Sequence, residues 1–322
     1  SKVYTNDNVM RLDELPARMV VIGGGVIAAE FSHVFSAFGT EVTQLNRSSR
    51  LLRGVDEEVV ARFEEAASKQ WNIVKDASLS EIRENADGSV TVVAKHTTEN
   101  GEELLEIPAD AVLVATGRRP NTDTLNAKNY FDVQDGGQLS VDKYQRVLYN
   151  GAPVPGVYAL GDVSSRYQLK HVANHEARVV QHNLSHPEDL RASDHRYVPA
   201  AVFSNPQIAV VGMTEEQARQ AAEREGFEIT VKAQNFGDTA YGWAMEDKIG
   251  LCKLFARKDN GVLLGAHLVG EESSVLIQPL LQAMSFGMDA RTLARGQYWI
   301  HPALTEIIEN ALLGLEFDEP AN

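Results

Sequence analysis

The sequence predicts an α/β protein with a parallel sheet and a β-meander insertion, followed by a thin middle segment and an α+β domain. Three observations predict this organisation. Short apolar strands alternate with helical periods from about residue 17, apolar runs become sparse from about residue 121, and alternating strands resume from about residue 197. We therefore expect domains over residues 1–120, 121–194 and 195–322, the middle one being part of a domain whose remainder lies elsewhere.

The first elements follow a strand–glycine–helix pattern. Met19–Ile22 is an apolar run that predicts a buried strand, and it leads into three glycines, Gly23 to Gly25. Apolar residues then recur at helical spacing up to Gly39: Ile27, Phe31, Val34, Phe35 and Phe38. A second strand over Glu41–Leu45 and a helix with Asp56 as its N-cap are expected next.

A three-stranded meander and another buried strand complete this part. The meander strands are expected over Ser80–Glu84, Val90–Lys95 and Glu103–Ile107, with a hairpin turn at Asp87 and Gly88. The apolar run Ala111–Val114 predicts the last strand. Parallel strands joined by helices, with one antiparallel insertion, indicate a Rossmann-like domain.

The remaining elements are fewer in the middle and denser at the C-terminal end. In the middle we expect a strand over Val157–Leu160 and a helix over roughly His171–Leu184. The C-terminal strands are expected to be antiparallel: Ala201–Phe203, Ile208–Gly212, Glu228–Ala233, Gly250–Ala256 and Val262–Val269. Its expected helices are Thr214–Glu225, Glu272–Phe286 and Pro302–Leu313.

Composition excludes several classes of function. The 322 residues include 45 acidic and 30 basic side chains, a net charge of −15 that argues against a nucleic-acid partner. No apolar run reaches the ~18 residues of a membrane span, and the first residues resemble neither a signal nor a transit peptide. The only cysteine, Cys252, rules out an internal disulfide and a redox thiol pair within this chain, and fits a reducing cytoplasm. No metal-ligand spacing unites the histidines, so we expect no metal site.

The glycine run has the spacing of a dinucleotide fingerprint. Gly23, Gly25 and Ala28 form G-x-G-x-x-A between a buried strand and an amphipathic helix. The glycines allow a tight turn and close approach of the backbone to a pyrophosphate, which the helix N-terminus attracts. The alternative is a tight strand–helix turn that binds nothing.

The end of the second strand indicates which nucleotide is bound. About twenty residues beyond the fingerprint, NAD-binding chains place a carboxylate against the ribose hydroxyls. Here the strand ends without one, and Arg47, Arg50 and Arg53 follow. Because guanidinium groups bind phosphate well, an adenosine 2′-phosphate is the favoured ligand and NADP(H) is preferred over NAD(H). The alternative is that the arginines belong to a solvated loop.

Three further motifs carry a family resemblance. ATGRRPN (Ala115–Asn121), ALGD (Ala159–Asp162) and YWIHPALTE (Tyr298–Glu306), together with the fingerprint, resemble the flavoprotein disulfide reductases over essentially the whole chain. The segments GQYWIHPALTEIIENALLGL and KHVANHEARVVQHNL are most similar to the mycothiol-specific branch of that family.

The resemblance implies two cofactors, NADPH and FAD, and residues that bind them. Gly117 closes the nucleotide-binding domain, and Gly161 precedes Asp162, which resembles the aspartate that binds an FAD ribityl hydroxyl. The helix beginning near His171 and Val172 would direct its N-terminus at the flavin and stabilise negative charge there.

The resemblance also implies catalytic roles. Glu30 resembles a glutamate beside the nicotinamide; its alternative is an ordinary solvated helix residue. His301 and Glu306 resemble an acid–base pair that protonates a leaving thiolate. In the family this histidine acts in the partner subunit's site, which implies a homodimer and a small-molecule disulfide as substrate.

The chain departs from the family in one respect. Family members begin with an additional FAD fingerprint and a pair of redox cysteines, and this sequence contains neither. We therefore expect it to be the C-terminal portion of a longer enzyme, with an incomplete FAD site and no disulfide reductase activity alone.

Other members of the family and one other class stay open. A dihydrolipoyl dehydrogenase would show an acidic residue near Asn46, where the arginines argue against it. A mercuric reductase is not distinguished. A non-catalytic nucleotide-binding or dimerisation module is disfavoured by the pair His301 and Glu306.

Overall fold

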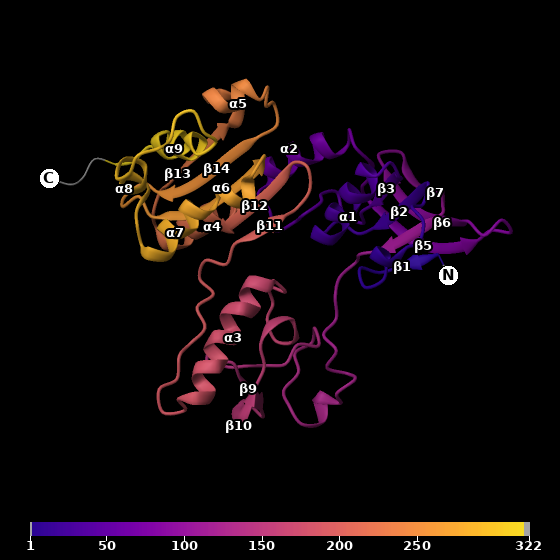
Figure 1. Ribbon diagram of the computed structural model, residues 1–322, viewed down its shortest axis with the longest axis horizontal. Coiled ribbons are helices and arrows are strands. Elements are labelled where there is room, and N and C mark those ends of the chain that lie inside the picture. Colours follow the sequence, from indigo (N-terminus) through magenta and orange to yellow (C-terminus); the bar gives the residue numbers. More distant parts are fainter. Residues whose placement is uncertain (1, 319–322) are drawn as a thin grey trace. The chain divides into compact units, whose positions relative to one another are not determined.

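The computed structural model describes residues 2–318. The chain divides into two compact units, one formed by the residues up to Thr116 and from Pro199 onward, the other by Gly117–Val198 (Figure 1). Whether the first unit counts as two domains, with boundaries at residues 120 and 195, stays a prediction.

A five-stranded parallel sheet carries the glycine motif. Its order is β1-β8-β2-β3-β4, with bounds β1 Val3–Tyr4, β2 Arg18–Ile22, β3 Glu41–Leu45, β4 Asn72–Val74 and β8 Ala111–Val114. Met19 and Val21 of β2 pack into a core with the helices, whereas Val20 and Ile22 pack into a second core with the meander. Successive side chains of a strand point to opposite faces, so both faces of this sheet are covered, as a parallel sheet requires.

Two helices cover one face of this sheet. The 3-10 turn η1 (Val9–Arg11) precedes β2, and α1 (Val26–Ala37) and α2 (Glu57–Ala67) follow β2 and β3. The predicted N-cap of α2 is confirmed, because the Asp56 carboxylate accepts a hydrogen bond from the Glu58 N–H.

The predicted apolar face of α1 is partly wrong. Val34 and Phe38 are 38% and 70% exposed, and the buried residues are Ala28, Ala29, Ser32 and Phe35. Small side chains let the helix approach the sheet closely, so packing distance rather than hydrophobicity selects the inner face.

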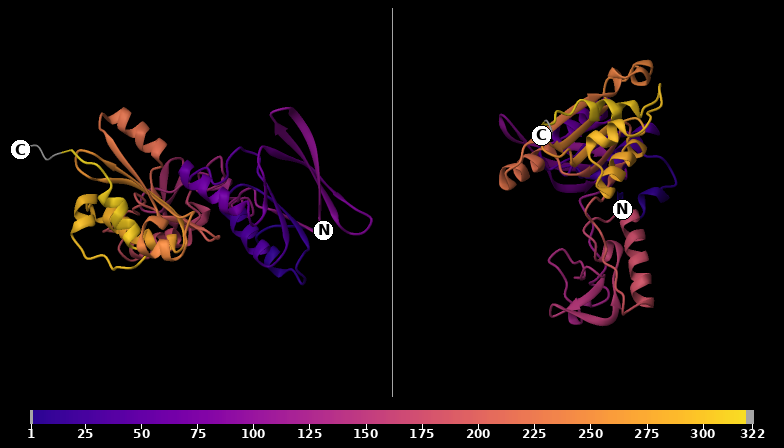
Figure 2. Two further views of the ribbon diagram at one scale, coloured as in Figure 1. Left: turned by 90° about the horizontal axis from the view of Figure 1, so that it is seen from above. Right: turned by 90° about the vertical axis from the view of Figure 1, so that its left-hand side faces the viewer.

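The predicted meander is confirmed as a separate three-stranded sheet in the order β5-β6-β7. Its strands are β5 Ala77–Glu84, β6 Val90–Thr98 and β7 Gly101–Ala109. The left view of Figure 2 shows it as a layer beside the parallel sheet. Val90 and Val92 of β6 bury their side chains against the sheet.

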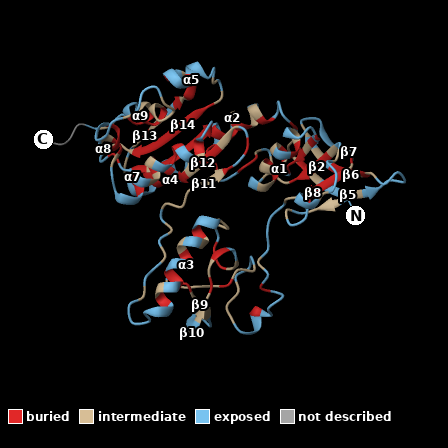
Figure 3. Cartoon of the chain, viewed as in Figure 1, coloured by how far each residue is buried: buried red, intermediate tan, exposed pale blue. Residues whose placement is uncertain are grey.

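The second half of this unit is an antiparallel sheet in the order β11-β12-β15-β14-β13. The strands are β11 Ala200–Val202, β12 Gln207–Gly212, β13 Ile229–Asn235, β14 Leu251–Arg257 and β15 Leu263–Gly270. Strands β14 and β15 are buried almost throughout, and Figure 3 shows β14 in red for most of its length. Helix α2 packs on β14 and β15, which ties the nucleotide half to this sheet.

Short helices surround the antiparallel sheet: α4 Glu215–Glu225, η4 Phe236–Asp238, α5 Ala240–Ala244, α6 Ser273–Leu276, α7 Gln278–Phe286, α8 Ala290–Arg295 and α9 Glu306–Leu313. The prediction of a single helix over Glu272–Phe286 is wrong. The segment forms two helices, α6 and α7, separated at Ile277. The break lies two residues before Pro279, which has no backbone N–H to donate. The last helix begins at Glu306 rather than Pro302; residues 301–305 form turns, and the Ala303 N–H of this segment donates to the Glu306 carboxylate instead of to a helix partner.

The second unit contains the hairpin β9 (Arg146–Tyr149) and β10 (Ala152–Tyr158), the 3-10 turns η2 (Ala127–Asn129) and η3 (Gly161–Val163), and helix α3 (Lys170–Ser185). The expected strand over Val157–Leu160 is shifted: β10 pairs with β9 and ends at Tyr158. This unit has a small hydrophobic core of its own, formed by four buried side chains: Ala127, Leu139, Val147 and Ala159.

No helix within residues 2–318 is long and apolar enough to cross a membrane. Over the same residues, no cluster of three or more His, Cys, Asp or Glu side chains is arranged to hold a metal ion. Cys252 is fully buried in β14, and burial raises the pKa of its thiol well above the ordinary value.

Candidate functional site

The glycine loop is shaped both by the fold and by an open space. Gly23 has a φ of 142°, and a Cβ there would lie 2.3 Å from the Ala115 carbonyl oxygen. A Cβ on Gly25, at the N-cap of α1, would meet nothing within 4 Å. The fold therefore requires glycine at Gly23, whereas Gly25 leaves room beside a helix N-terminus, as a bound pyrophosphate needs.

A buried polar side chain that sequence reasoning missed supports this loop. Gln44 of β3 donates from Nε2 to the Gly23 carbonyl oxygen at 2.9 Å. Its Oε1 accepts a hydrogen bond from Trp71 Nε1, also at 2.9 Å. Because both ends of this buried amide are bonded, it fixes the carbonyl of the first glycine.

The three predicted arginines lie on one short loop whose backbone is fixed by Asn46. The buried Asn46 amide donates to the Ser48 and Arg50 carbonyl oxygens at 2.6 and 3.0 Å. Arg50 Nη2 donates to the Arg53 carbonyl oxygen, and Arg53 Nε donates to Ser48 Oγ, each at 3.2 Å.

The guanidinium groups remain accessible to an anion. Arg47 and Arg53 are exposed and Arg50 is half-buried. Among residues 2–318, none of the three has a carboxylate within ion-pair distance. Three uncompensated cations beside the fingerprint in a chain of net charge −15 fit a phosphate ligand.

Glu30 is held by the opposite half of its unit. Its Oε1 accepts a hydrogen bond from the Phe203 backbone N–H at 2.9 Å. The carboxylate is therefore oriented by the segment that follows β11 and is not simply solvated. Its role beside a nicotinamide stays a prediction.

The structure brings the predicted acid–base residues together. His301 Nδ1 lies 2.7 Å from Glu306 Oε1, and Glu306 Oε2 accepts the Ala303 N–H at 3.3 Å. The Glu306 side chain is mostly buried, whereas that of His301 is 69% exposed. A carboxylate on Nδ1 favours the Nδ1–H tautomer, which leaves Nε2 able to take up and release a proton.

The residues predicted to bind flavin lie in the second unit. Asp162 Oδ2 is 3.4 Å from Arg118 Nη1, and a Cβ on Gly161 would lie 3.3 Å from that of Ala173 in the first turn of α3. At the N-cap of α3 stands Leu169, whose apolar side chain cannot cap the helix. The structure thus places the Gly161 turn, which precedes Asp162, against the first turn of α3, whose N-cap residue makes no side-chain capping bond.

The other predicted residues at this end have distinct settings. Val172 is buried in α3, and His171 precedes it in the first turn. Gly117 has a φ of 137° with nothing within 4 Å of an added Cβ. Their predicted contacts with a cofactor stay a prediction.

A second carboxylate–histidine pair, missed by sequence reasoning, supports the Asp162 turn. Glu176 is almost fully buried in α3; its Oε2 accepts the Gly161 N–H at 2.7 Å, and its Oε1 lies 2.9 Å from His195 Nε2. The sequence could have indicated that Glu176 is unusual, because it is a charged residue at an inward-facing position of the expected helix. Nothing in the sequence identifies His195, nineteen residues away, as its partner.

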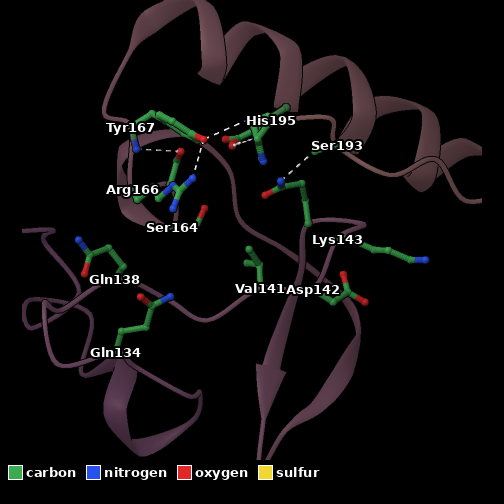
Figure 4. A pocket seen from close by; sticks show the side chains of 13 residues that line it. Gln134, Gln138, Val141, Asp142, Lys143, Ser164, Arg166, Tyr167, Ser193 and His195 are labelled. Atoms are coloured by element: carbon green, nitrogen blue, oxygen red, sulfur yellow. Dashed lines mark hydrogen bonds and ion pairs between the residues drawn. The ribbon is translucent and has the colours of Figure 1, made fainter. Parts of the chain in front are cut away.

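A cavity of about 410 Å³ lies beside this second pair. Figure 4 shows Tyr167 and His195 next to each other in its wall, and the Tyr167 hydroxyl donates to the His195 carbonyl oxygen at 3.2 Å. Two lining atoms, Gln145 Oε1 and Ser164 Oγ, are buried and have no hydrogen-bond partner in the described part of the chain. None of the residues predicted to bind flavin lines this cavity.

Comparison with known proteins agrees with this arrangement. Residues 1–177 match the sequence model of the pyridine nucleotide-disulphide oxidoreductases, and residues 198–312 match that of the dimerisation domain of the same family. The chain is 51% identical over 317 residues to a mycothione reductase of Mycobacterium tuberculosis, covering 97% of this chain. It is 33% identical over 310 residues to a dihydrolipoyl dehydrogenase of Synechocystis, covering 96% of this chain.

A solved structure has the same fold. The HOCl-induced flavoprotein disulfide reductase RclA of Escherichia coli superimposes with a TM-score of 0.84 at 28% identity, covering 97% of this chain and 68% of that one. The chain spans 65% of the length of each of the two relatives named above. The matched segments, the glycine loop and the paired His301 and Glu306 lead to one conclusion: this chain belongs to the pyridine nucleotide-disulphide oxidoreductase family.

Proposed function

We propose that this chain is the nucleotide-binding and dimerisation part of an NADPH-dependent, FAD-containing disulfide reductase, and that the substrate is mycothione, the disulfide of mycothiol. The three arginines beside the dinucleotide fingerprint, which form no ion pair within residues 2–318, carry the cofactor assignment. The 51% identity to a mycothione reductase supports the substrate.

The two cofactors supply the redox chemistry, and the chain supplies binding and proton transfer. When bound, FAD would take hydride from NADPH and pass two electrons on to a disulfide. Gly25 and the start of α1 would hold the NADPH pyrophosphate, and Arg47, Arg50 and Arg53 the 2′-phosphate. Asp162 and the first turn of α3 would hold FAD.

His301 would move the proton that disulfide cleavage requires. A thiolate leaving the substrate needs a proton, and Nε2 of His301 is the atom able to deliver it, because Glu306 holds Nδ1. The Glu306 carboxylate also holds the imidazole ring in one orientation during this transfer. The 69% exposure of its side chain supports a role for His301 on a substrate outside its own fold.

The exposed position of His301 supports a homodimer. Large apolar side chains flank it or lie elsewhere on the same half: Phe203, Trp243, Val275, Phe286, Tyr298 and Ile300 are all more than half exposed. Exposed apolar surface of this kind is typical of protein interfaces. The reductase would work in the cytoplasm, where small thiols are kept reduced.

Calorimetric titration of the chain with NADPH and then NADH at one ionic strength tests the cofactor assignment. We expect NADPH to bind at least about tenfold more tightly, and Arg47→Glu to remove most of that difference. Arg11→Glu is the matched control, because Arg11 is exposed on η1 and changes the net charge equally. Equal binding of both nucleotides would contradict the 2′-phosphate site and favour a dihydrolipoyl dehydrogenase.

The substrate is tested on the flavin-loaded reductase that contains these 322 residues. NADPH oxidation should be fast with mycothione and at least about a hundredfold less efficient with glutathione disulfide or lipoamide. Equal efficiency with all three disulfides would contradict the proposed substrate.

A further inference from the structure

An ammonium group is buried where the nucleotide half meets the antiparallel sheet. Lys253 lies in the middle of β14, and its side chain is only 7% exposed. Its Nζ lies 2.9 Å from Asp56 Oδ1, 3.1 Å from Glu58 Oε2 and 2.7 Å from Glu215 Oε2. The other residues of this strand up to Ala256 are apolar and buried, so this lysine is an exception within its own element.

The same contact fixes Asp56 at its backbone as well. His267 Nδ1 accepts the Asp56 N–H at 3.1 Å, and His267 Nε2 donates to the Met213 carbonyl oxygen at 3.0 Å. Asp56 Oδ2 accepts the Glu215 N–H at 3.2 Å. Asp56 is therefore bonded through its N–H and both carboxylate oxygens, and all the partners except Glu58 come from the antiparallel half.

Asp56 is also the end of the arginine loop. It is the N-cap of α2 and stands three residues after Arg53. The segment between Leu52 and Asp56 is also bonded at its Leu52 end. The Leu52 N–H donates to the Gly24 carbonyl oxygen, and the Val55 N–H donates to the Leu52 carbonyl oxygen, each at 2.8 Å. A displacement of Asp56 would therefore move Arg53, three residues away, whereas the hydrogen bond from Leu52 to Gly24 keeps the glycine loop in place.

The Lys253 ammonium group and its three carboxylate partners stay charged although they are packed at a mostly apolar contact. Burial alone would lower the pKa of Lys253, but the hydrogen bonds to Glu215, Asp56 and Glu58 outweigh it and raise the pKa, so the group stays charged. Replacing a buried ion pair by apolar side chains is often neutral for stability, whereas the geometry of an ion pair is directional. Directional fixing of the start of α2 is what this cluster provides beyond apolar contact.

We propose that Lys253 is a positioning residue for NADPH recognition: by fixing Asp56 it sets where Arg53 stands relative to the 2′-phosphate, and with it Arg50, whose guanidinium donates to the Arg53 carbonyl oxygen. This inference rests on the proposed NADPH site. Lys253 itself touches neither the glycine loop nor an arginine of the loop; its effect passes through the α2 N-cap.

The test is titration of the whole chain with NADPH and NADH after Lys253→Met. We expect the NADPH affinity to fall about tenfold and the NADH affinity to change less than about twofold, because only the 2′-phosphate contacts are displaced. Lys253→Arg keeps the charge and should restore most of the preference. Lys258→Met is the matched control, since Lys258 directly follows β14 and its Nζ forms an ion pair with Glu228 on the protein surface.

A merely structural role would give a different result. Loss of thermal stability with an unchanged NADPH-to-NADH ratio would overturn the proposal. If Lys253→Met does not fold, Asp56→Asn keeps an N-cap acceptor while weakening the ion pair, and should lower the ratio in the same direction; an unchanged ratio there is equally contradictory. A wild-type chain without NADPH preference would instead refute the proposed NADPH site.

Discussion

His301 and Glu306 are joined by a hydrogen bond of 2.7 Å, and the carboxylate of that pair is itself tied to the backbone N–H of Ala303. The imidazole thus takes its orientation from a side chain that cannot rotate freely. An exposed histidine without such a partner would sample several rotamers, and the proton on Nε2 would have no fixed direction.

Glu306→Gln should therefore impair proton transfer more than binding. In the flavin-loaded reductase we expect turnover to fall roughly tenfold to a hundredfold with a small change in KM. Nitrogen-15 NMR of the histidines should also show His301 losing its preference for the Nδ1–H tautomer. Glu309→Gln, one turn further along α9, is the control and should leave both readouts unchanged; equal effects of the two substitutions would refute the role of Glu306.

Alanine at Gly23 and at Gly25 should give opposite phenotypes. Gly23→Ala places a Cβ 2.3 Å from the Ala115 carbonyl oxygen at a positive φ and should lower the free energy of unfolding by about 2 kcal/mol or more. Gly25→Ala meets no atom of the chain and should change it by less than about 1 kcal/mol, yet weaken NADPH binding by crowding the pyrophosphate.

Urea denaturation and calorimetry on both variants separate the two effects. Normal NADPH binding by a stable Gly25→Ala chain would mean that the loop is only a tight turn. The two variants act as controls for each other, because each removes one glycine of the same motif.

The stability of the chain should depend on His267 between pH 6.5 and 4. Burial is the main cause that lowers the pKa of His267 to about 4 from the ordinary 6.5; the Asp56 carboxylate opposes this shift, and the Lys253 charge adds to it. In this window the unfolded chain binds a proton that the folded chain does not. The free energy of unfolding therefore falls as the pH is lowered from 6.5 to 4, by up to about 3 kcal/mol from this group.

His267→Gln isolates that contribution. A glutamine can accept the Asp56 N–H and donate to the Met213 carbonyl oxygen without titrating. Urea denaturation at several pH values should give a flatter profile for this variant. The Asp56 carboxyl does not confuse the result: although burial acts to raise its pKa, the Lys253 hydrogen bond lowers it below 3.8, so its stabilisation is lost only at still lower pH. Identical slopes for both chains would contradict the assignment.

Glu176 should control the turn that carries Asp162. Glu176→Gln replaces a buried carboxylate that accepts the Gly161 N–H by an amide with one acceptor, at a cost of about 1–3 kcal/mol. Hydrogen exchange at the Gly161 amide should become about tenfold faster or more. The exposed Glu188→Gln, from the same unit, should not change that rate; a Gly161 amide that stays protected in Glu176→Gln would show that the carboxylate is dispensable.

The sequence predicts local features of this fold well and long-range polar contacts poorly. The α2 N-cap at Asp56 and the strand–glycine–helix order depend on neighbouring residues, and both are confirmed. The inner face of α1 was misjudged because Ala28 and Ala29 pack closely where larger residues would not fit.

The missed residues share one property. Gln44, Glu176 and Lys253 are buried polar side chains, and their partners lie 15 to 197 residues away. The sequence pattern can indicate that such a polar residue will be buried. It cannot identify the hydrogen-bond partner, because the fold brings that partner close from a distant part of the chain. His301 and Glu306 were found because they are close in sequence and belong to a family motif.

The core beneath α2 has a thermodynamic consequence. Phe63 and Trp71 from the nucleotide half share one continuous core with Val202, Ile208 and Val269 of the antiparallel sheet. Apolar groups that bury one another cannot be exposed separately, so the two halves should melt in a single cooperative transition. A ligand that binds the glycine loop would then raise the melting temperature of strands it never touches, through mass action on a common unfolding equilibrium.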